Sequence, residues 1–269
     1  MTSSQPSLNL AIRQDTSLYD FVSQGYTPII AAINKLCDGD LSELFIYGGK
    51  GFGKTHLALA IYGTYSKRGD NAVILSLKEM VGRQSDDVNV LVGLETFDLI
   101  ILDDIQSIAQ NHEWQEALFH LINRVRKEKK QLIFLADKPA RELDIHMLDL
   151  TTRLSLAPAL KLPNGEDLAD RIAIINSILR RKNWRLPEEI LTHLIDEGPR
   201  NAGGIIAVLD SIASLLTHLT RVQVPKKTIE EAKSIIERKT LLLELEVDNY
   251  VYGNVIDTFK SQGYNNEIS

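Results

Sequence analysis

The hydrophobic positions of the chain follow two patterns, which change near Asn164. Before that residue, short and nearly continuous apolar runs alternate with stretches in which apolar residues recur at helical spacing. Strands that are covered on both faces read as continuous apolar runs, so this pattern predicts a parallel sheet flanked by helices. The predicted strands are 44–47, 72–76, 99–104, 131–137 and 157–162.

The first part of the chain also contains predicted helices with recognisable ends. One begins at Pro28, with Thr27 as its expected N-cap. Another spans 114–125, and the charged run 126–130 is expected to be its solvated end. The segment 20–26, before the first helix, is expected to be a loop.

After Asn164 the strand signals stop, and the apolar spacing becomes helical. This predicts a second, smaller and all-helical domain, followed by a stretch with a poorer helical pattern whose role the sequence leaves open. The predicted helices are 168–181, 187–197, 202–219 and 228–237. The predicted division is a mobile N-terminal segment 1–15, an α/β domain 16–163, a helical lid domain 164–237 and an extension 238–269.

Composition narrows the class of protein without identifying it. The 269 residues are 44% hydrophobic and 25% charged, which is enough for one α/β domain and a smaller second one. The net charge of −6 argues against a broad basic surface for non-specific DNA binding. The single cysteine, the absence of a secretion signal and the absence of a membrane-length apolar run together predict a cytoplasmic protein without a membrane partner.

One glycine-rich stretch carries the strongest chemical signal in the chain. The sequence GGKGFGKT matches the phosphate-loop pattern G-x-x-x-x-G-K-[ST], and it lies between the predicted strand 44–47 and a helical stretch 56–62. Glycines let the backbone approach a phosphate, and the N-terminus of the following helix attracts the anion. Lys54 can reach the β- and γ-phosphates of ATP or ADP, and Thr55 can hold Mg²⁺. The predicted nucleotide-binding residues here are Gly48, Gly49, Lys50, Gly51, Phe52, Gly53, Lys54, Thr55 and His56.

Acidic residues follow two of the predicted strands. Asp103 and Asp104 end a hydrophobic strand, where one carboxylate can hold Mg²⁺ and the next can activate a water molecule. Asp137 ends the next strand, where it can contact the γ-phosphate or the attacking water. In each case the alternative is an acid that only caps a turn. For Arg153 and Arg200, the residues alone favour an ordinary surface or structural role.

Taken together, these motifs resemble the AAA+ ATPases, and within them the DnaA family of replication initiators. The stretch LIILDDIQS is similar to the family's Walker B strand, and the segment 135–143 is similar to its sensor 1 segment. The segment 149–154 resembles box VII, which implies an arginine finger at Arg153, and Arg200 resembles the sensor 2 arginine. The resemblance covers about residues 8–237 and implies an AAA+ P-loop fold: a parallel sheet core flanked by helices, then a helical lid.

Two departures point to one group within this family. Residues 238–269 show no pattern of the helix-turn-helix DNA-binding domain of DnaA, and no N-terminal oligomerisation domain is recognised, so an AAA+ core alone is expected. That layout resembles the Hda group, DnaA-homologous proteins that inactivate DnaA after initiation. Such proteins begin with a peptide that binds the sliding clamp, and QPSLNL is similar to it at Gln5, Leu8 and Leu10 but departs from it at Pro6 and Asn9.

The resemblance implies a negative regulator of replication initiation that is bound to the DNA-loaded sliding clamp, the beta subunit of DNA polymerase III. It would stimulate hydrolysis of DnaA-bound ATP through Arg153, would have weak hydrolysis of its own, and would reach DNA only through the clamp. One alternative is an AAA+ helicase loader of the DnaC or IstB type, and another is an independent ATPase or nucleotide kinase, for which no substrate-binding segment is identified. The working nucleotide, homo-oligomer formation and the function of the variant clamp peptide are left open by the sequence.

Overall fold

The computed structural model describes residues 17–21, 24–81, 87–215 and 224–261. The chain divides into two compact units, Met1–Asn164 and Gly165–Ser269, and each is described by itself. The predicted clamp-binding residues Gln5, Leu8 and Leu10 lie outside the described residues. Among the described residues, no helix combines the length and the apolar character needed to cross a lipid bilayer.

The first unit is built on a five-stranded parallel sheet with the order β2-β3-β4-β1-β5. At the carboxyl edge, Tyr47 of β1 pairs with Ala136 of β4, and Ser76 of β2 pairs with Asp103 of β3. The polar residues that follow these strands are therefore collected at one edge. The strands are β1 (Glu43–Tyr47), β2 (Ala72–Ser76), β3 (Leu99–Asp103), β4 (Gln131–Ala136) and β5 (Ala159–Lys161).

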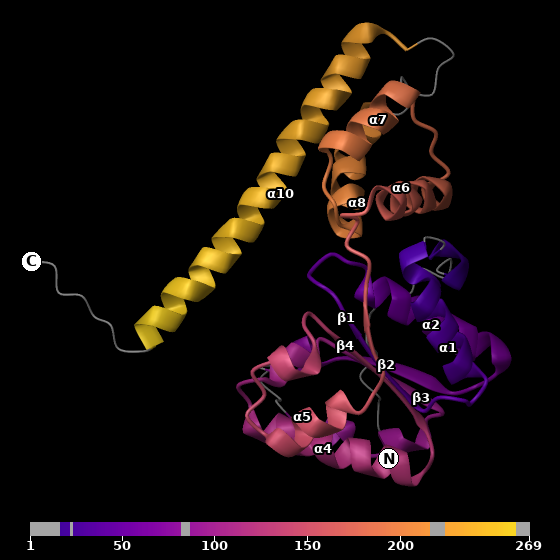
Figure 1. The fold of residues 1–269 in the computed structure, drawn as a ribbon, viewed down its shortest axis with the longest axis vertical. Coiled ribbons are helices and arrows are strands. Elements are labelled where there is room, and N and C mark those ends of the chain that lie inside the picture. Colours follow the sequence, from indigo (N-terminus) through magenta and orange to yellow (C-terminus); the bar gives the residue numbers. More distant parts are fainter. Residues whose placement is uncertain (1–16, 22–23, 82–86, 216–223, 262–269) are drawn as a thin grey trace, which may run out of the picture. The chain divides into compact units, whose positions relative to one another are not determined.

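Helices cover both faces of this sheet. Figure 1 shows α1 and α2 on one face and α4 and α5 on the other. The α-helices of this unit are α1 (Thr27–Cys37), α2 (Lys54–Arg68), α3 (Leu77–Met80), α4 (His112–Lys127) and α5 (Leu148–Ser155). Short 3-10 helices are η1 (Leu18–Asp20), η2 (Gln24–Tyr26), η3 (Val88–Leu91), η4 (Leu94–Thr96), η5 (Ile105–Ile108) and η6 (Ala140–Glu142).

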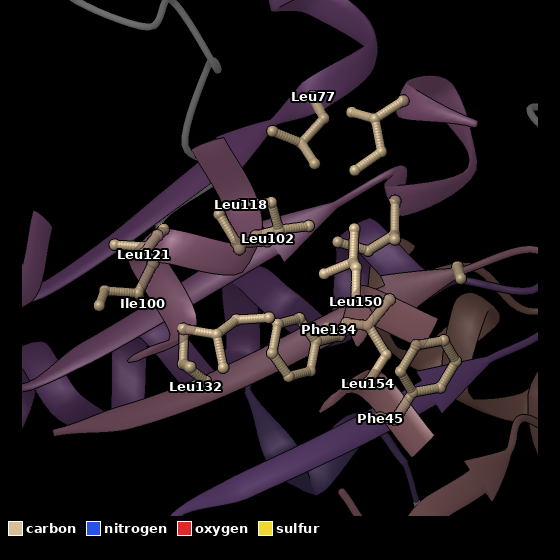
Figure 2. Packing of buried hydrophobic residues seen from close by; sticks show 14 of the residues in the cluster. Phe45, Leu77, Ile100, Leu102, Leu118, Leu121, Leu132, Phe134, Leu150 and Leu154 are labelled. Atoms are coloured by element: carbon tan, nitrogen blue, oxygen red, sulfur yellow. The ribbon is translucent and has the colours of Figure 1, made fainter. Parts of the chain in front are cut away.

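The core between the sheet and α4 and α5 explains the continuous apolar runs. Alternate strand residues such as Leu102 and Phe134 point toward Leu118 of α4 and Leu150 of α5 (Figure 2), and all four are fully buried. The intervening strand residues are buried as well, so β3 and β4 are covered on both faces. Burying one such side chain contributes about 2 kcal/mol, which fixes the sheet as a rigid platform.

The second unit is helical. Its helices are α6 (Leu168–Lys182), α7 (Glu188–Glu197), α8 (Ala202–Ser211), the 3-10 helix η7 (Ala213–Leu215) and α10 (Lys226–Ser261). Helix α8 ends at Ser211, whereas the apolar spacing predicts a helix through residue 219. Helix α10 continues beyond Glu237, where the predicted helix 228–237 ends. The sequence from Lys226 to Tyr252 contains no glycine or proline that would end it.

Three local predictions differ from the structure. Thr27 lies inside α1, whose N-cap is Tyr26 without a side-chain bond; Pro28 sets the first turn instead. The expected loop 20–26 contains the end of η1 and all of η2. The charged run predicts a solvated helix end at Arg126, but the guanidinium of this residue forms a bidentate ion pair with Glu43 at 2.5 and 2.8 Å.

Candidate functional site

The phosphate-loop sequence connects β1 to α2. Gly51 and Gly53 have φ values of +83° and +90°, which non-glycine residues rarely adopt. Gly53 is also the N-cap of α2 and supplies no side-chain cap for the first turn. The first N–H groups of this 15-residue helix therefore face the loop without a side-chain acceptor at the N-cap position, as an anion site requires.

Lys54 lies folded against this loop. Its Nζ donates to the carbonyl oxygens of Gly48 at 2.6 Å and Gly49 at 3.1 Å. Burial lowers the pKa of Lys54, while the nearby charges of three carboxylates, Asp103, Asp104 and Asp137, oppose that shift. The lysine is thus a half-buried cation at the centre of an acidic cluster, where phosphate oxygens can replace the two loop carbonyls.

Asp103 faces Thr55 across the floor of the site. The hydroxyl of Thr55 donates to Asp103 Oδ2 at 2.7 Å, and the Asp103 side chain is almost entirely buried. Burial raises the pKa of Asp103, and the Thr55 hydrogen bond works against that increase. A buried carboxylate without a cation costs free energy, so this pair is suited to receive one.

The donor set fits Mg²⁺. Within the described residues, no group of three or more His, Cys, Asp or Glu side chains is placed to hold a metal ion. The oxygens of Thr55 and Asp103 are hard ligands of the kind that Mg²⁺ takes together with water and phosphate oxygens. The two predicted metal residues would therefore leave most ligand positions of the ion to water and phosphate oxygens.

Asp104 has an unusual backbone conformation. This residue lies just past the end of β3, at the start of η5, and its φ is +60°. Such a conformation is strained, though aspartate tolerates it better than most residues. Both carboxylate oxygens accept hydrogen bonds, Oδ1 from Gln106 Nε2 at 3.0 Å and Oδ2 from the Ser76 hydroxyl at 3.3 Å. The strained turn and the two donors fix the direction of this carboxylate.

Asp137 follows β4 at the same edge of the sheet. Its backbone N–H donates to Gln106 Oε1 at 3.2 Å. Among the described residues, its Oδ1 is a buried oxygen without a hydrogen-bond partner. Sequence reasoning missed Gln106 and Ser76 as site residues, although Gln106 stands two positions after Asp104 in the DDIQ motif.

The remaining predicted residues around the loop contact different neighbours. The Phe52 ring lies close to Gly48 and Gly49, so a Cβ at Gly49 would meet it at 3.4 Å. The His56 side chain lies against the N-terminal segment, with Nε2 4.0 Å from Asp20 Oδ2 and its ring 5.4 Å from that of Phe21. Among the predicted binding residues, His56 therefore offers the site its backbone rather than its ring.

Within the described residues, the Arg153 side chain contacts α4 and not this acidic cluster. Its guanidinium lies 5.7 Å from the centroid of the Phe119 ring, within the range of a cation–π contact. Its backbone carbonyl accepts a hydrogen bond from Arg126 Nη2 at 3.1 Å. Because Arg126 is also paired with Glu43, the end of α5 is tied to the start of β1.

Arg200 belongs to the second unit and lies between α7 and α8, in a turn whose backbone is fixed by contacts with neighbouring residues. The side chain of Arg171 is buried and donates to the carbonyl of Gly198. Asn201 caps α8 by accepting from Gly204 N at 2.8 Å. Gly165 has a φ of +70° and lies so close to the Arg200 carbonyl that a Cβ would overlap it. The backbone at Arg200 is thus fixed, while its side chain is exposed.

Comparison with known sequences gives a consistent result. The model of the bacterial DnaA ATPase domain matches residues 26–159. An uncharacterized protein of Haemophilus influenzae is 30% identical over 208 residues, covering 76% of this chain and 88% of that protein. The chromosomal replication initiator protein DnaA of Thermoanaerobacter sp. (strain X514) is 29% identical over 237 residues. That match covers 82% of this chain and 52% of that protein, so the chain spans about half the length of these DnaA relatives.

Solved structures share the fold. Domain III of the Thermotoga maritima replication initiation protein DnaA matches with a TM-score of 0.69 and 22% identity, covering 83% of this chain and 98% of that one. AMPPCP-bound DnaA from Aquifex aeolicus matches with a TM-score of 0.65 and 25% identity, covering 75% and 66%. The predicted α/β architecture, with a parallel sheet core and a helical second unit, is confirmed.

Proposed function

The chain belongs to the DnaA family of AAA+ ATPases, and from this we propose that it binds ATP or ADP and promotes hydrolysis of the ATP held by DnaA. This is the function of the Hda group, a negative regulator of replication initiation. Two observations together carry the proposal: the phosphate-loop site is formed, and Arg153 on α5 is held by α4 instead of by that site. The formed site suits a protein that binds a nucleotide itself. The position of Arg153 suits action on a nucleotide that another molecule holds.

Nucleotide binding is supported by chemistry and by relationship. Lys54, the uncapped start of α2 and the glycine backbone offer donors for phosphates, and a DnaA structure of the same fold holds the ATP analogue AMPPCP. Thr55 and Asp103 would hold Mg²⁺, which would supply positive charge to offset the negative charge of the phosphates. Gly48 to His56 and Asp137 are proposed to complete the nucleotide site of the first unit, while the role of Arg200, which lies in the second unit, stays a prediction of the sequence.

The chain's own hydrolysis is proposed to be weak. Asp104 is proposed to accept a proton from an attacking water, and the hydrogen bonds from Ser76 and Gln106 that orient its carboxylate support this role. Within the described residues Arg153 reaches α4 rather than this cluster, so it is not proposed to serve as the finger of the chain's own site. An arginine finger contributes roughly 10³ to 10⁵ in rate, and its absence leaves slow turnover.

Arg153 is proposed to act in trans. Inserted near the γ-phosphate held by DnaA, its guanidinium would stabilise the charge that develops during phosphoryl transfer. Phe119 and Arg126 hold the side chain and the backbone of this residue before any partner arrives. Pre-organisation of this kind reduces the entropy lost on docking.

The proposal includes the sliding clamp as a second partner. Gln5, Leu8 and Leu10 would insert into an apolar groove of the clamp, which brings the protein to DNA indirectly. Tethering raises the effective concentration at the clamp without any new contact to DnaA. We propose no contact with a membrane and no direct contact with DNA. The protein could also form homo-oligomers.

The direct test measures hydrolysis of DnaA-bound radiolabelled ATP in single turnover. The reactions contain DnaA with this protein, with the DNA-loaded clamp, with both, or with neither. The proposal expects acceleration only when both are present, and expects Lys54→Ala to lose nucleotide binding measured separately by a fluorescent ADP. Equal acceleration without the clamp would contradict the tether, and no acceleration by a folded, nucleotide-bound protein would contradict the proposed function.

A further inference from the structure

The side chain of Gln106 lies between Asp104 and Asp137, two acids proposed to act at the nucleotide site. It lies in η5, directly after β3, and its amide is bonded at both ends. The Nε2 donates to Asp104 Oδ1 at 3.0 Å, while the Oε1 accepts from the backbone N–H of Asp137 at 3.2 Å. A primary amide can donate and accept at once, whereas a carboxylate only accepts and an ammonium only donates.

The sheet shows why such a bridge is needed. The paired register of β3 and β4 ends at Leu102 and Phe134, one residue before Asp103. Beyond that pair, β4 continues beside β1, where Tyr47 pairs with Ala136. The tips of β3 and β4 therefore separate at the carboxyl edge, and the side chain of Gln106 spans the gap that the backbone ladder no longer closes.

The bridge is anchored on both sides. Ile105 and Ile108, which flank Gln106 in η5, are fully buried, and Ser107 N donates to the Asp104 carbonyl at 2.9 Å. Asp104 itself has a φ of +60°, which neighbouring contacts must maintain. The amide thus joins a strained, fixed carboxylate to the tip of the next strand.

We propose that Gln106 is a positioning residue that sets the spacing of Asp104 and Asp137 and so determines how strongly the site distinguishes ATP from ADP. This inference rests on the nucleotide-binding part of the proposed function and on none of its protein partners. Lys54 and Thr55 interact with phosphates that ADP also has. The two acids beside the strand tips are the groups proposed to address the γ-phosphate and its attacking water.

The expected effect is a change in preference rather than a general loss of binding. Without the amide, the Asp104 carboxylate and the backbone at Asp137 both lose a hydrogen bond that holds them in position. The negative charges of the two displaced acids would then oppose the γ-phosphate, which ATP has and ADP lacks. ADP depends on the loop and on Lys54, whose contacts do not involve Gln106. ATP analogues should therefore lose affinity while ADP keeps it.

The test titrates the full chain with ADP and with AMPPCP in the presence of Mg²⁺. Gln106→Met keeps the length of the side chain and removes both hydrogen bonds; Gln110→Met, at an exposed position four residues later, is the matched control. We expect Gln106→Met to weaken AMPPCP binding by about tenfold and ADP binding by less than twofold. The Gln110→Met variant should match the wild type.

A second variant keeps the test informative if methionine disturbs the fold. Gln106→Glu can still accept from the Asp137 N–H but faces Asp104 with a second carboxylate, so it should lose AMPPCP affinity at least as strongly. Equal losses for ADP and AMPPCP, or no change in either, would overturn the inference while leaving nucleotide binding intact. A wild-type chain that binds neither nucleotide would instead contradict the proposed function on which the inference rests.

Discussion

Asp103 shows how a single residue can reduce stability for the sake of binding. Burial raises its pKa above the ordinary value for aspartate, with the Thr55 hydrogen bond opposing the shift. A carboxyl whose folded pKa exceeds its unfolded pKa costs stability at pH values above the folded pKa. That cost disappears as the pH falls below the unfolded pKa. The ionised carboxylate is therefore a cost at neutral pH until a cation neutralises it.

This gives a prediction with a defined pH dependence. Asp103→Asn should raise the Tm of the nucleotide-free protein at pH 7 by about 2–4 °C, and the gain should shrink as the pH falls toward 4. The same variant should lose Mg²⁺-dependent nucleotide binding. Differential scanning calorimetry across pH checks the first part, with Asp87→Asn at an exposed position as control. A Tm that falls at pH 7 would contradict the account of this buried charge.

At the scale of elements, the Glu43–Arg126 pair connects β1, α4 and α5. The Glu43 side chain is 9% exposed, and Arg126 also donates to the backbone of Arg153. Arg126→Met should lower the free energy of unfolding by about 3 kcal/mol, because it leaves a buried carboxylate unpaired. The double variant with Glu43→Leu should recover most of that loss in urea unfolding. The Lys127→Met control changes an exposed neighbour and should stay near wild type. Equal loss in the single and double variants would contradict this explanation.

The start of the second unit offers another element-scale prediction. Gly165→Ala should cost about 3 kcal/mol, because its positive φ and the close Arg200 carbonyl both exclude a Cβ. Gly39 has a φ of +83° with open space around it, so Gly39→Ala should cost only about 1 kcal/mol. Denaturant unfolding followed by circular dichroism compares the two. Similar losses in both variants would show that the carbonyl contact is unimportant.

For the whole molecule, the N-terminal peptide is proposed to decide where the protein works. Deleting residues 1–10 should weaken binding to the sliding clamp by more than tenfold and leave nucleotide affinity unchanged. Surface plasmon resonance with immobilised clamp measures this, with Asn9→Ala as a control that spares Gln5, Leu8 and Leu10. Undiminished clamp binding by the deletion variant would place the contact elsewhere in the chain.

Much of this architecture could be predicted from the sequence, for a physical reason. Strands covered on both faces must be apolar throughout, and the structure confirms β2 at Ala72–Ser76 as predicted and β4 within one residue. The pairing of Glu43 with Arg126 could not be read from the sequence, because the two lie 83 positions apart and Arg126 stands in a charged run. The bridging role of Gln106 was missed for a similar reason, since it depends on two strands separating at their tips.

The trans action of Arg153 is decided by single-turnover hydrolysis of DnaA-bound ATP with the DNA-loaded clamp, comparing wild type with Arg153→Ala and Arg153→Lys. Both variants should bind nucleotide and clamp as the wild type does. Arg153→Ala should lose stimulation by a factor of about 10³ or more. Arg153→Lys should recover only part of it, because an ammonium lacks the planar fork of the guanidinium. Undiminished stimulation by Arg153→Ala would contradict the claim that this residue acts on the nucleotide of DnaA.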